Sequence, residues 1–512
     1  MRVRARLVTA ADLPDEALGR DAPPDLGDID AEAFRSAAHE VVDVMADYLA
    51  RIEDFAVLPP IEPGSIAPLF PASAPEEPEP LADILADYRR LVEPNATHWQ
   101  HPGFMAYFPT TASAAGILGE MLTAAIGQNT MLWRTSPIGT ELETVVVSWM
   151  RQGFGLPDDF DGFLTDTAST SSLIALGAAR EAAGLDASAL GLTARPDLGQ
   201  PRIYASTEAH SSIEKATMTL GLGRAGVVRI PADDKYRMRV DALIEAIAAD
   251  RGAGCRPIAI VATLGTTSST SVDPVDTIAD VASAEGLWLH VDAAYAGPAA
   301  LLPEKRPLFD GWERADSIVV NPHKWLFTPL DASLLLTRRM SELRAAFSLV
   351  PEYLRTLDRA GAVRDVNEYT PQLGRRFRAL KVWLLLRWFG LDGLRRRLRH
   401  HIEQAAALAG WIDDDPAWER LAPAPFSTVC FRFRPQALSG REAEPAVAAR
   451  LDDLNARIMD AVNRTGEVFL NHTRLRDRFT IRVALGQLRT EDRHVARAWE
   501  LLRREAACLG SA

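Results

Sequence analysis

The stretch Asn321-Pro322-His323-Lys324-Trp325-Leu326-Phe327 follows the run Ser317-Ile318-Val319-Val320. Because the β-branched run predicts a strand, Lys324 falls just past a strand end. Lysine is otherwise scarce, and the only others are Lys215, Lys235, Lys305 and Lys381. Burial lowers the pKa of a lysine amine and leaves it nucleophilic, a role that arginine cannot fill. The stretch therefore indicates covalent attachment of a carbonyl cofactor, with pyridoxal phosphate as the leading candidate; the alternative is an ordinary surface lysine after a strand.

A second stretch lies upstream, where residues 287–297 read LWLHVDAAYAG. It predicts an apolar strand that ends in the carboxylate of Asp292. A carboxylate fixed against a pyridine nitrogen raises the pKa of that nitrogen, and the protonated ring becomes an electron sink. The small residues Ala293, Ala294 and Gly297 would let backbone and ring approach closely. An aspartate at this place is otherwise a turn or helix-capping residue.

Hydroxyl side chains are concentrated in residues 165–172, which read TDTASTSS. They precede an apolar stretch, 173–183, that predicts a helix. The start of a helix attracts anions through its free backbone N–H groups and its dipole. A capping serine or threonine accounts for one hydroxyl but hardly for six. The run therefore predicts the binding site of a phosphate group.

Predicted strands and helices alternate between about residues 113 and 381. The strands are 202–205, 227–230 and 258–262, and the helices include 212–220 and 275–285. This order predicts an α/β domain with a mostly parallel sheet, whose ligand binds outside the carboxyl ends of the strands. Asp292 and Lys324 both fall at such ends. Two later strands, 428–433 and 479–483, predict a smaller α+β domain.

Together with other motifs, these stretches resemble the group II pyridoxal-phosphate-dependent decarboxylases, most closely the aromatic-L-amino-acid decarboxylases. The resemblance covers all but the first 28 or so residues, and its other motifs are 97–99 (THW), 106–110 (AYFPT), 136–143 (SPIGTELE), 209–212 (AHSS), 264–267 (LGTT) and 373–378 (LGRRFR). It implies the aspartate-aminotransferase-like fold, called fold type I. It also implies a homodimer whose N-terminal segment packs on the partner.

The resemblance also implies roles for individual residues. Lys324, His210 and Tyr353 are expected to be catalytic, with Tyr353 as the proton donor on a mobile polar loop and His210 stacked over the pyridine ring. The expected cofactor contacts are Lys324, Asp292, His210, Ala168, Ser169, Thr267, Ala294, Ser317, Asn321 and His323. The expected substrate pocket consists of Trp99, Tyr107, Phe108 and Thr110, and no metal is expected.

The implied reaction is decarboxylation of an L-amino acid to an amine, with an aromatic substrate favoured by the aromatic pocket. Leu330 replaces the phenylalanine of the animal enzymes, so phenylalanine, tyrosine, tryptophan and dihydroxyphenylalanine stay open as substrates. A non-aromatic acid such as glutamate or diaminobutyrate also stays open. Further alternatives are an aromatic aldehyde synthase, which tends to carry phenylalanine in place of Tyr353, an aminotransferase, and a relative that binds without catalysis.

Composition agrees with a large cytosolic enzyme. The chain has 512 residues, 47% of them hydrophobic, and a net charge of -13, which argues against a nucleic-acid partner. Its three cysteines are widely spaced, as in a reducing compartment, and no signal peptide or membrane span is evident. The predicted organisation is an extension (1–28), an N-terminal segment (29–112), a cofactor-binding α/β domain (113–381) and a C-terminal α+β domain (382–512).

Overall fold

The computed structural model describes residues 27–193, 195–349 and 363–510, which divide into two compact units. The described part of the first unit consists of residues 27–52 and 61–96. It holds α1 (Ala31–Ala50) and α2 (Leu81–Asp87). The carboxylate of Asp30 caps α1 by accepting hydrogen bonds from two backbone N–H groups of its first turn. The proline-rich stretch between them contains no α-helix, as its composition predicts.

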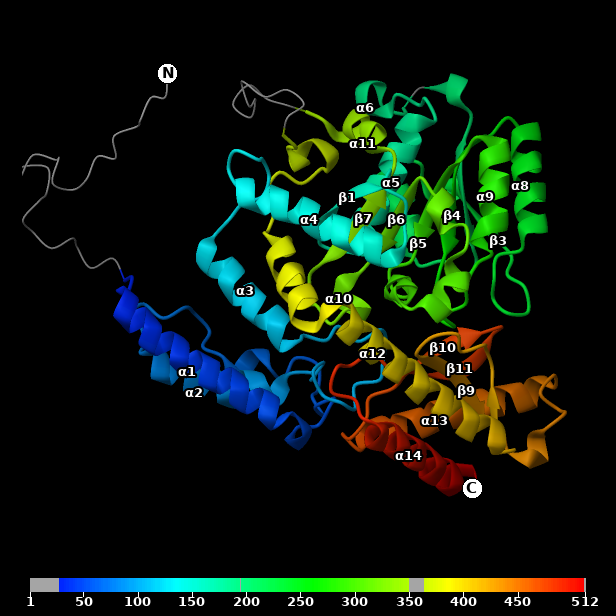
Figure 1. Cartoon of the computed structure of the whole chain (residues 1–512). Helices are drawn as coiled ribbons and strands as arrows, with labels where there is room; N and C mark the ends of the chain where they lie inside the picture. Colours follow the sequence, from blue (N-terminus) through cyan, green and yellow to red (C-terminus); the bar gives the residue numbers. More distant parts are fainter. Residues whose placement is uncertain (1–26, 194, 350–362, 511–512) are drawn as a thin grey trace, which may run out of the picture. The chain divides into compact units, whose positions relative to one another are not determined.

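The second unit contains a seven-stranded sheet in the order β1-β7-β6-β5-β4-β2-β3 (Figure 1). Only β7 runs antiparallel to its neighbours, so the sheet is mostly parallel and the predicted fold class is confirmed. The strands are β1 (Asp161–Thr165), β2 (Pro201–Ser206), β3 (Val227–Ile230), β4 (Arg256–Thr263), β5 (Trp288–Asp292), β6 (Ser317–Val320) and β7 (Ser333–Thr337).

Helices cover both faces of this sheet. One face carries a hydrophobic cluster with α5 (Ala168–Ala182), α7 (Ser212–Thr219) and α11 (Met340–Phe347). The other face carries a cluster with α4 (Pro137–Phe154), α8 (Val240–Gly252) and α9 (Val275–Glu285). Side chains alternate along β5, so Leu289 and Val291 join the second cluster and Trp288 joins the first. His290 therefore lies on the α5 side, as its hydrogen bond to that helix requires.

The described part of the second unit contains six further α-helices. They are α3 (Ala114–Ile126), α6 (Ala187–Leu190), α10 (Pro322–Trp325), α12 (Arg378–Asp414), α13 (Pro445–Arg464) and α14 (Asp492–Gly510). Gly390 kinks α12, because its φ of 60° interrupts the helical backbone. None of the helices in the described ranges is long and apolar enough to cross a bilayer.

The smaller sheet has four antiparallel strands in the order β10-β11-β9-β8. They are β8 (Trp418–Arg420), β9 (Thr428–Phe433), β10 (Asn471–Leu475) and β11 (Arg478–Ala484). Helices α13 and α14 lie beside this sheet (Figure 1), and their apolar residues form a separate hydrophobic core with those of β9 and β11. This arrangement confirms the prediction of a smaller α+β part near the C-terminus.

Candidate active site

A cavity of about 230 Å³ lies at the carboxyl ends of the central strands. Most of its lining residues end or follow β1, β2, β4, β5 and β6, as the rule for parallel sheets predicts. The structure brings the following predicted residues together around it: Phe108, Ala168, Ser169, His210, Thr267, Asp292, Ala294, Asn321, His323 and Lys324. Thr167, Ser212, Thr263, Gly265 and Tyr295 complete the lining.

Lys324 is carried by the short helix α10 and is partly buried. Burial lowers the pKa of its amine, the negative charge of Asp292 opposes that shift, and the positive charge of Arg482 adds to it. A lowered pKa increases the share of the neutral, nucleophilic amine at neutral pH. The environment therefore suits a lysine that attacks a carbonyl group.

Asp292 ends β5 and is 6% exposed. Its Oδ1 accepts a hydrogen bond of 3.0 Å from the backbone N–H of Ala294, which fixes the orientation of the carboxylate. Its Oδ2 accepts no hydrogen bond from the described residues. One oxygen is thus left to interact with a cationic group in the cavity.

The N-terminus of α5 forms one wall of the cavity. Thr167 is its N-cap, with a side chain that accepts from the N–H of Thr170. The N–H groups of Ala168 and Ser169, the first two of the helix, have no acceptor among the described residues. Free N–H groups at the positive end of a helix dipole suit an anionic group such as phosphate.

Not all the hydroxyls of the predicted phosphate run face the cavity. The Ser171 hydroxyl lies 2.7 Å from that of Thr165 and 3.0 Å from that of Ser333. The Ser172 hydroxyl lies 3.1 Å from Nε2 of His290. Both serines are completely buried against the sheet. Part of this run therefore packs α5 on the strands, and only its beginning is available to a ligand.

Two histidines in the lining have defined hydrogen bonds. The Nδ1 atom of His210 accepts from the N–H of Ser212 at 3.1 Å, and that of His323 accepts from the N–H of Ala332 at 2.9 Å. Nε2 is therefore the ring nitrogen of each that can donate. Burial, followed by the charge of Lys324, lowers the pKa of His323 to about 3. Partial burial lowers the pKa of His210, and Asp292 opposes that shift.

Two buried polar atoms of the lining have no hydrogen-bond partner among the described residues: Oδ1 of Asn321 and Oγ1 of Thr263. Such atoms are costly unless a ligand or water binds them. The cavity thus combines a nucleophilic amine, a buried carboxylate, unpaired N–H groups at a helix start and unpaired polar atoms. This set matches the aldehyde, the ring nitrogen, the phosphate and the ring hydroxyl of pyridoxal phosphate.

Phe108 has both faces of its ring covered. One face stacks on Tyr295, with ring centroids 3.8 Å apart, and Tyr295 stacks in turn on Trp325 at 5.0 Å. Lys324 Nζ lies 5.3 Å from the Phe108 centroid, and the guanidinium carbon of Arg482 lies 4.4 Å from it. The ring was expected to form a wall for the substrate. It lines the cavity, and it also lies beneath two cations.

Arg482 is a feature that sequence reasoning missed. It lies in β11 and is 2% exposed. Its guanidinium donates to the backbone oxygens of Tyr107 and Ser268, while its Nη2 has no partner among the described residues. A buried guanidinium with a free donor suits a carboxylate ligand. The only signal in the sequence is an arginine at a buried position of an apolar strand.

Several predicted site residues do not line the cavity. Ser317 begins β6, whereas Asn321 follows the other end of that strand, and the Ser317 hydroxyl accepts from Trp288 Nε1 at 2.8 Å. Trp99 stacks on Phe104 at 4.2 Å, outside the lining. Tyr107 and Thr110 are also absent from it. Tyr353 lies outside the described residues.

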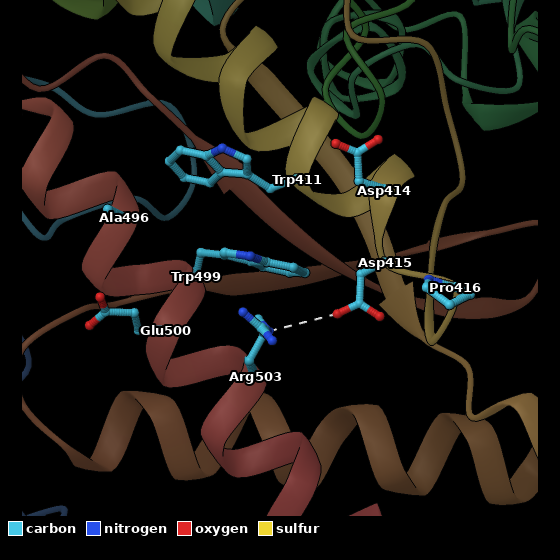
Figure 2. A pocket seen from close by; sticks show the side chains of 8 residues that line it. All are labelled: Trp411, Asp414, Asp415, Pro416, Ala496, Trp499, Glu500 and Arg503. Atoms are coloured by element: carbon cyan, nitrogen blue, oxygen red, sulfur yellow. Dashed lines mark ion pairs between the residues drawn. The ribbon is translucent and has the colours of Figure 1, made fainter.

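A larger hollow, of about 570 Å³, lies between α12 and α14 (Figure 2). It is lined by two indoles, those of Trp411 and Trp499, and by several charged residues. Asp415 and Arg503 form an ion pair of 3.7 Å there. None of the predicted site residues lines it. Size alone thus does not identify the active site of this chain.

Comparison with known proteins agrees with the geometry. The pyridoxal-dependent decarboxylase conserved domain matches residues 63–434. Phenylacetaldehyde synthase of Arabidopsis thaliana is 38% identical to the chain, over 94% of the chain and 97% of its own length. Aromatic-L-amino-acid decarboxylase of Sus scrofa is 39% identical, with the same coverage. The crystal structure of Oryza sativa TDC with PLP and tryptamine superimposes with a TM-score of 0.89 at 36% identity, covering 94% of this chain and 98% of that one.

Proposed function

The chain belongs to the pyridoxal-dependent decarboxylases, and from this premise we propose that it converts an aromatic L-amino acid into the corresponding amine and carbon dioxide. Its cofactor is pyridoxal 5'-phosphate. When bound, the cofactor supplies an electron sink for the negative charge that decarboxylation leaves at the α-carbon. The residues of the chain bind and orient the reacting groups around that sink.

We assign the cofactor contacts as follows. Lys324 would hold the cofactor at its aldehyde carbon, and the carboxylate of Asp292 would keep the ring nitrogen protonated. The free N–H groups of Ala168 and Ser169 bind the phosphate. Asn321 and Thr263 contribute the buried polar atoms that have no partner within the described chain. His210, which lines the cavity, would stack over the ring, as the resemblance to the family implies.

The observation that carries the proposed reaction is the buried guanidinium of Arg482. It lies over the same phenylalanine ring as Lys324, and its Nη2 is left without a protein partner in the described ranges. An amino-acid carboxylate bound there would be oriented next to the lysine. Orienting the scissile bond relative to the cofactor ring selects decarboxylation over the other reactions at the α-carbon.

The distribution of cations supports a substrate with an uncharged side chain. Among the described lining residues, Lys324 is the only lysine or arginine, and Arg482, outside the lining, lies over the same Phe108 ring. Both are assigned to the cofactor and to the α-carboxylate, so the described lining offers no further permanent cation. An acidic side chain would lack the partner that a buried charge requires. The names of the two relatives above point to aromatic substrates.

An aromatic aldehyde synthase is the second candidate function, because one relative with 38% identity is a phenylacetaldehyde synthase. Two residues support simple decarboxylation: Tyr353, the proposed proton donor to the α-carbon, and His210. The two reactions differ in their products, since the synthase consumes oxygen and releases hydrogen peroxide together with the aldehyde. Amine without peroxide is the outcome that we propose.

The experiment that tests the proposal is a substrate panel. Protein loaded with pyridoxal phosphate is incubated aerobically and anaerobically with phenylalanine, tyrosine, tryptophan, dihydroxyphenylalanine, glutamate and diaminobutyrate. Amine, aldehyde and peroxide are measured, with Lys324→Ala as control. We expect amine from at least one aromatic acid, in equal amounts with and without oxygen. Amine from glutamate or diaminobutyrate alone would overturn the aromatic assignment, and peroxide with aldehyde would establish the synthase.

We also propose that the enzyme is a homodimer and that it works in the cytosol. Apolar side chains on the surface of α3 and α4 support the dimer: Leu118, Met121, Leu122, Ile126, Ile138, Val145 and Trp149 are all exposed. Exposed apolar surface of this extent is typical of protein interfaces. The division at residues 28, 112 and 381 stays a prediction, as does the packing of the N-terminal segment on the partner.

A further inference from the structure

His290 lies two residues before Asp292 on β5 and is completely buried. Both of its ring nitrogens have partners. Nδ1 lies 2.8 Å from the Ser317 hydroxyl, and Nε2 lies 3.1 Å from the Ser172 hydroxyl. Burial lowers the pKa of His290 to about 4, so the imidazole is neutral near pH 7. A neutral imidazole offers one donor and one acceptor, which allows it to bind both hydroxyls at once.

The partners of His290 belong to the elements that carry the cofactor contacts. Ser172 lies in the second turn of α5, and the free N–H groups of that helix are in its first turn. Ser317 begins β6, the strand that leads to Asn321 and Lys324. Asp292 is on β5 itself. One buried side chain thus connects the three elements on which the phosphate site, the ring-nitrogen partner and the reactive lysine stand.

This connection is reinforced by a second donor. The Ser317 hydroxyl also accepts from Trp288 Nε1 at 2.8 Å, and Trp288 is on β5 as well. Ser317 is therefore bound from two positions of the neighbouring strand. The apolar contacts between α5 and the sheet tolerate small shifts. Directional hydrogen bonds between buried groups restrict such shifts.

We propose that His290 is a positioning residue that fixes the distance between the phosphate site at the start of α5 and the carboxylate of Asp292. The inference rests on the proposed cofactor site, because it concerns how that site is held in register. His290 itself does not line the cavity. His290 acts through Ser172 and Ser317. In this proposal Ser317 supports the site from behind, in place of the predicted contact with the cofactor.

The test compares the affinity of the apoprotein for pyridoxal phosphate with its affinity for pyridoxal. Pyridoxal lacks the phosphate. The dissociation constant of pyridoxal divided by that of pyridoxal phosphate therefore reports how well the phosphate and ring sites are matched. The variants are His290→Leu, His290→Gln and Ser172→Ala. We expect His290→Leu to weaken phosphate-dependent binding about tenfold or more, so that the ratio falls by the same factor. Glutamine keeps a donor and an acceptor and should retain most of the ratio.

The matched control is His101→Leu. His101 is also a buried histidine with a protein hydrogen bond, to the N–H of Gly103, and it lines a different hollow, together with Glu53, Val468 and Arg493 among others. Both leucine variants should lower the melting temperature, and only His290→Leu should lower the ratio. If His290→Leu does not fold, Ser172→Ala carries the test, with a smaller loss in the same direction.

Unchanged ratios in His290→Leu or in Ser172→Ala would overturn the inference. An equal fall in His290→Leu and His101→Leu would also overturn it, because the effect would then be one of general stability. Failure of the unmodified protein to bind pyridoxal phosphate would instead contradict the proposed cofactor site, so the two failures are distinguishable.

Discussion

The guanidinium of Arg482 lies over the ring of Phe108, with its central carbon 4.4 Å from the ring centroid. Phe108 is one of the residues predicted to form the substrate pocket, and Arg482 belongs to β11 of the smaller sheet. The contact therefore links segments that are far apart in the chain. Lys324 approaches the same ring. The aromatic quadrupole stabilises two like charges that would otherwise repel each other in a buried site.

Replacing Arg482 should damage substrate binding more than cofactor binding. In Arg482→Met the substrate carboxylate loses its proposed partner, at a cost of about 2 kcal/mol or more, which is roughly 30-fold in kcat/KM. The dissociation constant of pyridoxal phosphate should change much less. Steady-state kinetics and a cofactor titration measure the two effects. Arg474→Met, in an exposed ion pair with Asp452, is the matched control and should leave both unchanged. If Arg482→Met weakened cofactor binding by the same factor as it lowered kcat/KM, the assignment would be contradicted.

Phe108→Leu should lower kcat/KM about tenfold, because each cation–π contact is worth roughly 0.5–2 kcal/mol. The ring stabilises the charged form of Lys324, so its removal should lower the pKa of that amine further. The acidic limb of the pH profile for cofactor binding should then move to lower pH. Phe469→Leu, a partly buried aromatic outside the cavity lining, serves as control. A profile that moves to higher pH would show that the ring does not act on the lysine.

Stability should fall as the solution becomes mildly acidic. Burial lowers the pKa of His101 and His290 to about 4 and that of His323 and His401 to about 3, from 6.5. Below pH 6.5 the unfolded chain binds protons that the folded chain does not, so each histidine contributes stability that is present at pH 7 and is lost toward pH 4.

The expected loss is about 1.4 kcal/mol per pH unit for each such histidine at full effect. Urea titrations between pH 7 and pH 5 measure the slope. His101→Gln should reduce this slope by the contribution of one histidine. A free energy of unfolding that does not change over this range would contradict the neutral, buried state of these side chains.

The buried ion pair of Arg375 and Glu143 should be essential for the fold around the cavity. Their atoms are 2.7 Å apart, with the two side chains 1% and 4% exposed. Arg375 also donates to the backbone oxygen of Leu164 at 2.7 Å, near the end of β1. Glu143→Ala leaves the guanidinium uncompensated, which typically costs about 3–5 kcal/mol. Glu143→Gln keeps an acceptor and should cost less. Equal melting temperatures for the two variants would contradict this prediction.

The exposed apolar side chains of α3 and α4 should be covered by a second copy of the chain. Leu122→Glu and Trp149→Glu, each at a position at least 40% exposed, should shift the mass measured by light scattering from that of a dimer to that of a monomer. Ile244→Glu, at a similarly exposed position on α8, is the control and should remain dimeric. A monomeric unmodified protein would contradict the dimer.

Local patterns were sufficient to predict most of the sheet and its chemistry. The strand before Lys324 and the strand before Asp292 each carry their functional residue at the carboxyl end, so one parallel sheet brings both to one cavity. The helix predicted over 173–183 begins earlier, at Ala168, so most of the hydroxyl run lies in the first turns of α5 and not before it. The strands predicted at 227–230 and 428–433 have those bounds in the structure.

Relationships across the chain could not be predicted in this way. Ser317 is only four residues from Asn321. At about 3.3 Å per residue, however, the strand between them places the two residues at its opposite ends. Arg482 has no motif around it, and its importance follows only from contacts with Tyr107 and Phe108, which no local pattern records. The contacts of the Phe108 ring with Tyr295, Lys324 and Arg482 likewise join distant parts of the chain, so the sequence could not predict them.

The release of carbon dioxide from a carboxyl-labelled aromatic amino acid tests the central claim most directly. Holoenzyme is supplied with L-tryptophan, L-tyrosine, L-phenylalanine and L-dihydroxyphenylalanine, each labelled with carbon-13 in the carboxyl group, and labelled carbon dioxide and unlabelled amine are quantified together. The account predicts equal amounts of the two from at least one of these acids, abolished in Lys324→Ala. Binding of pyridoxal phosphate without labelled carbon dioxide from any of them would contradict it.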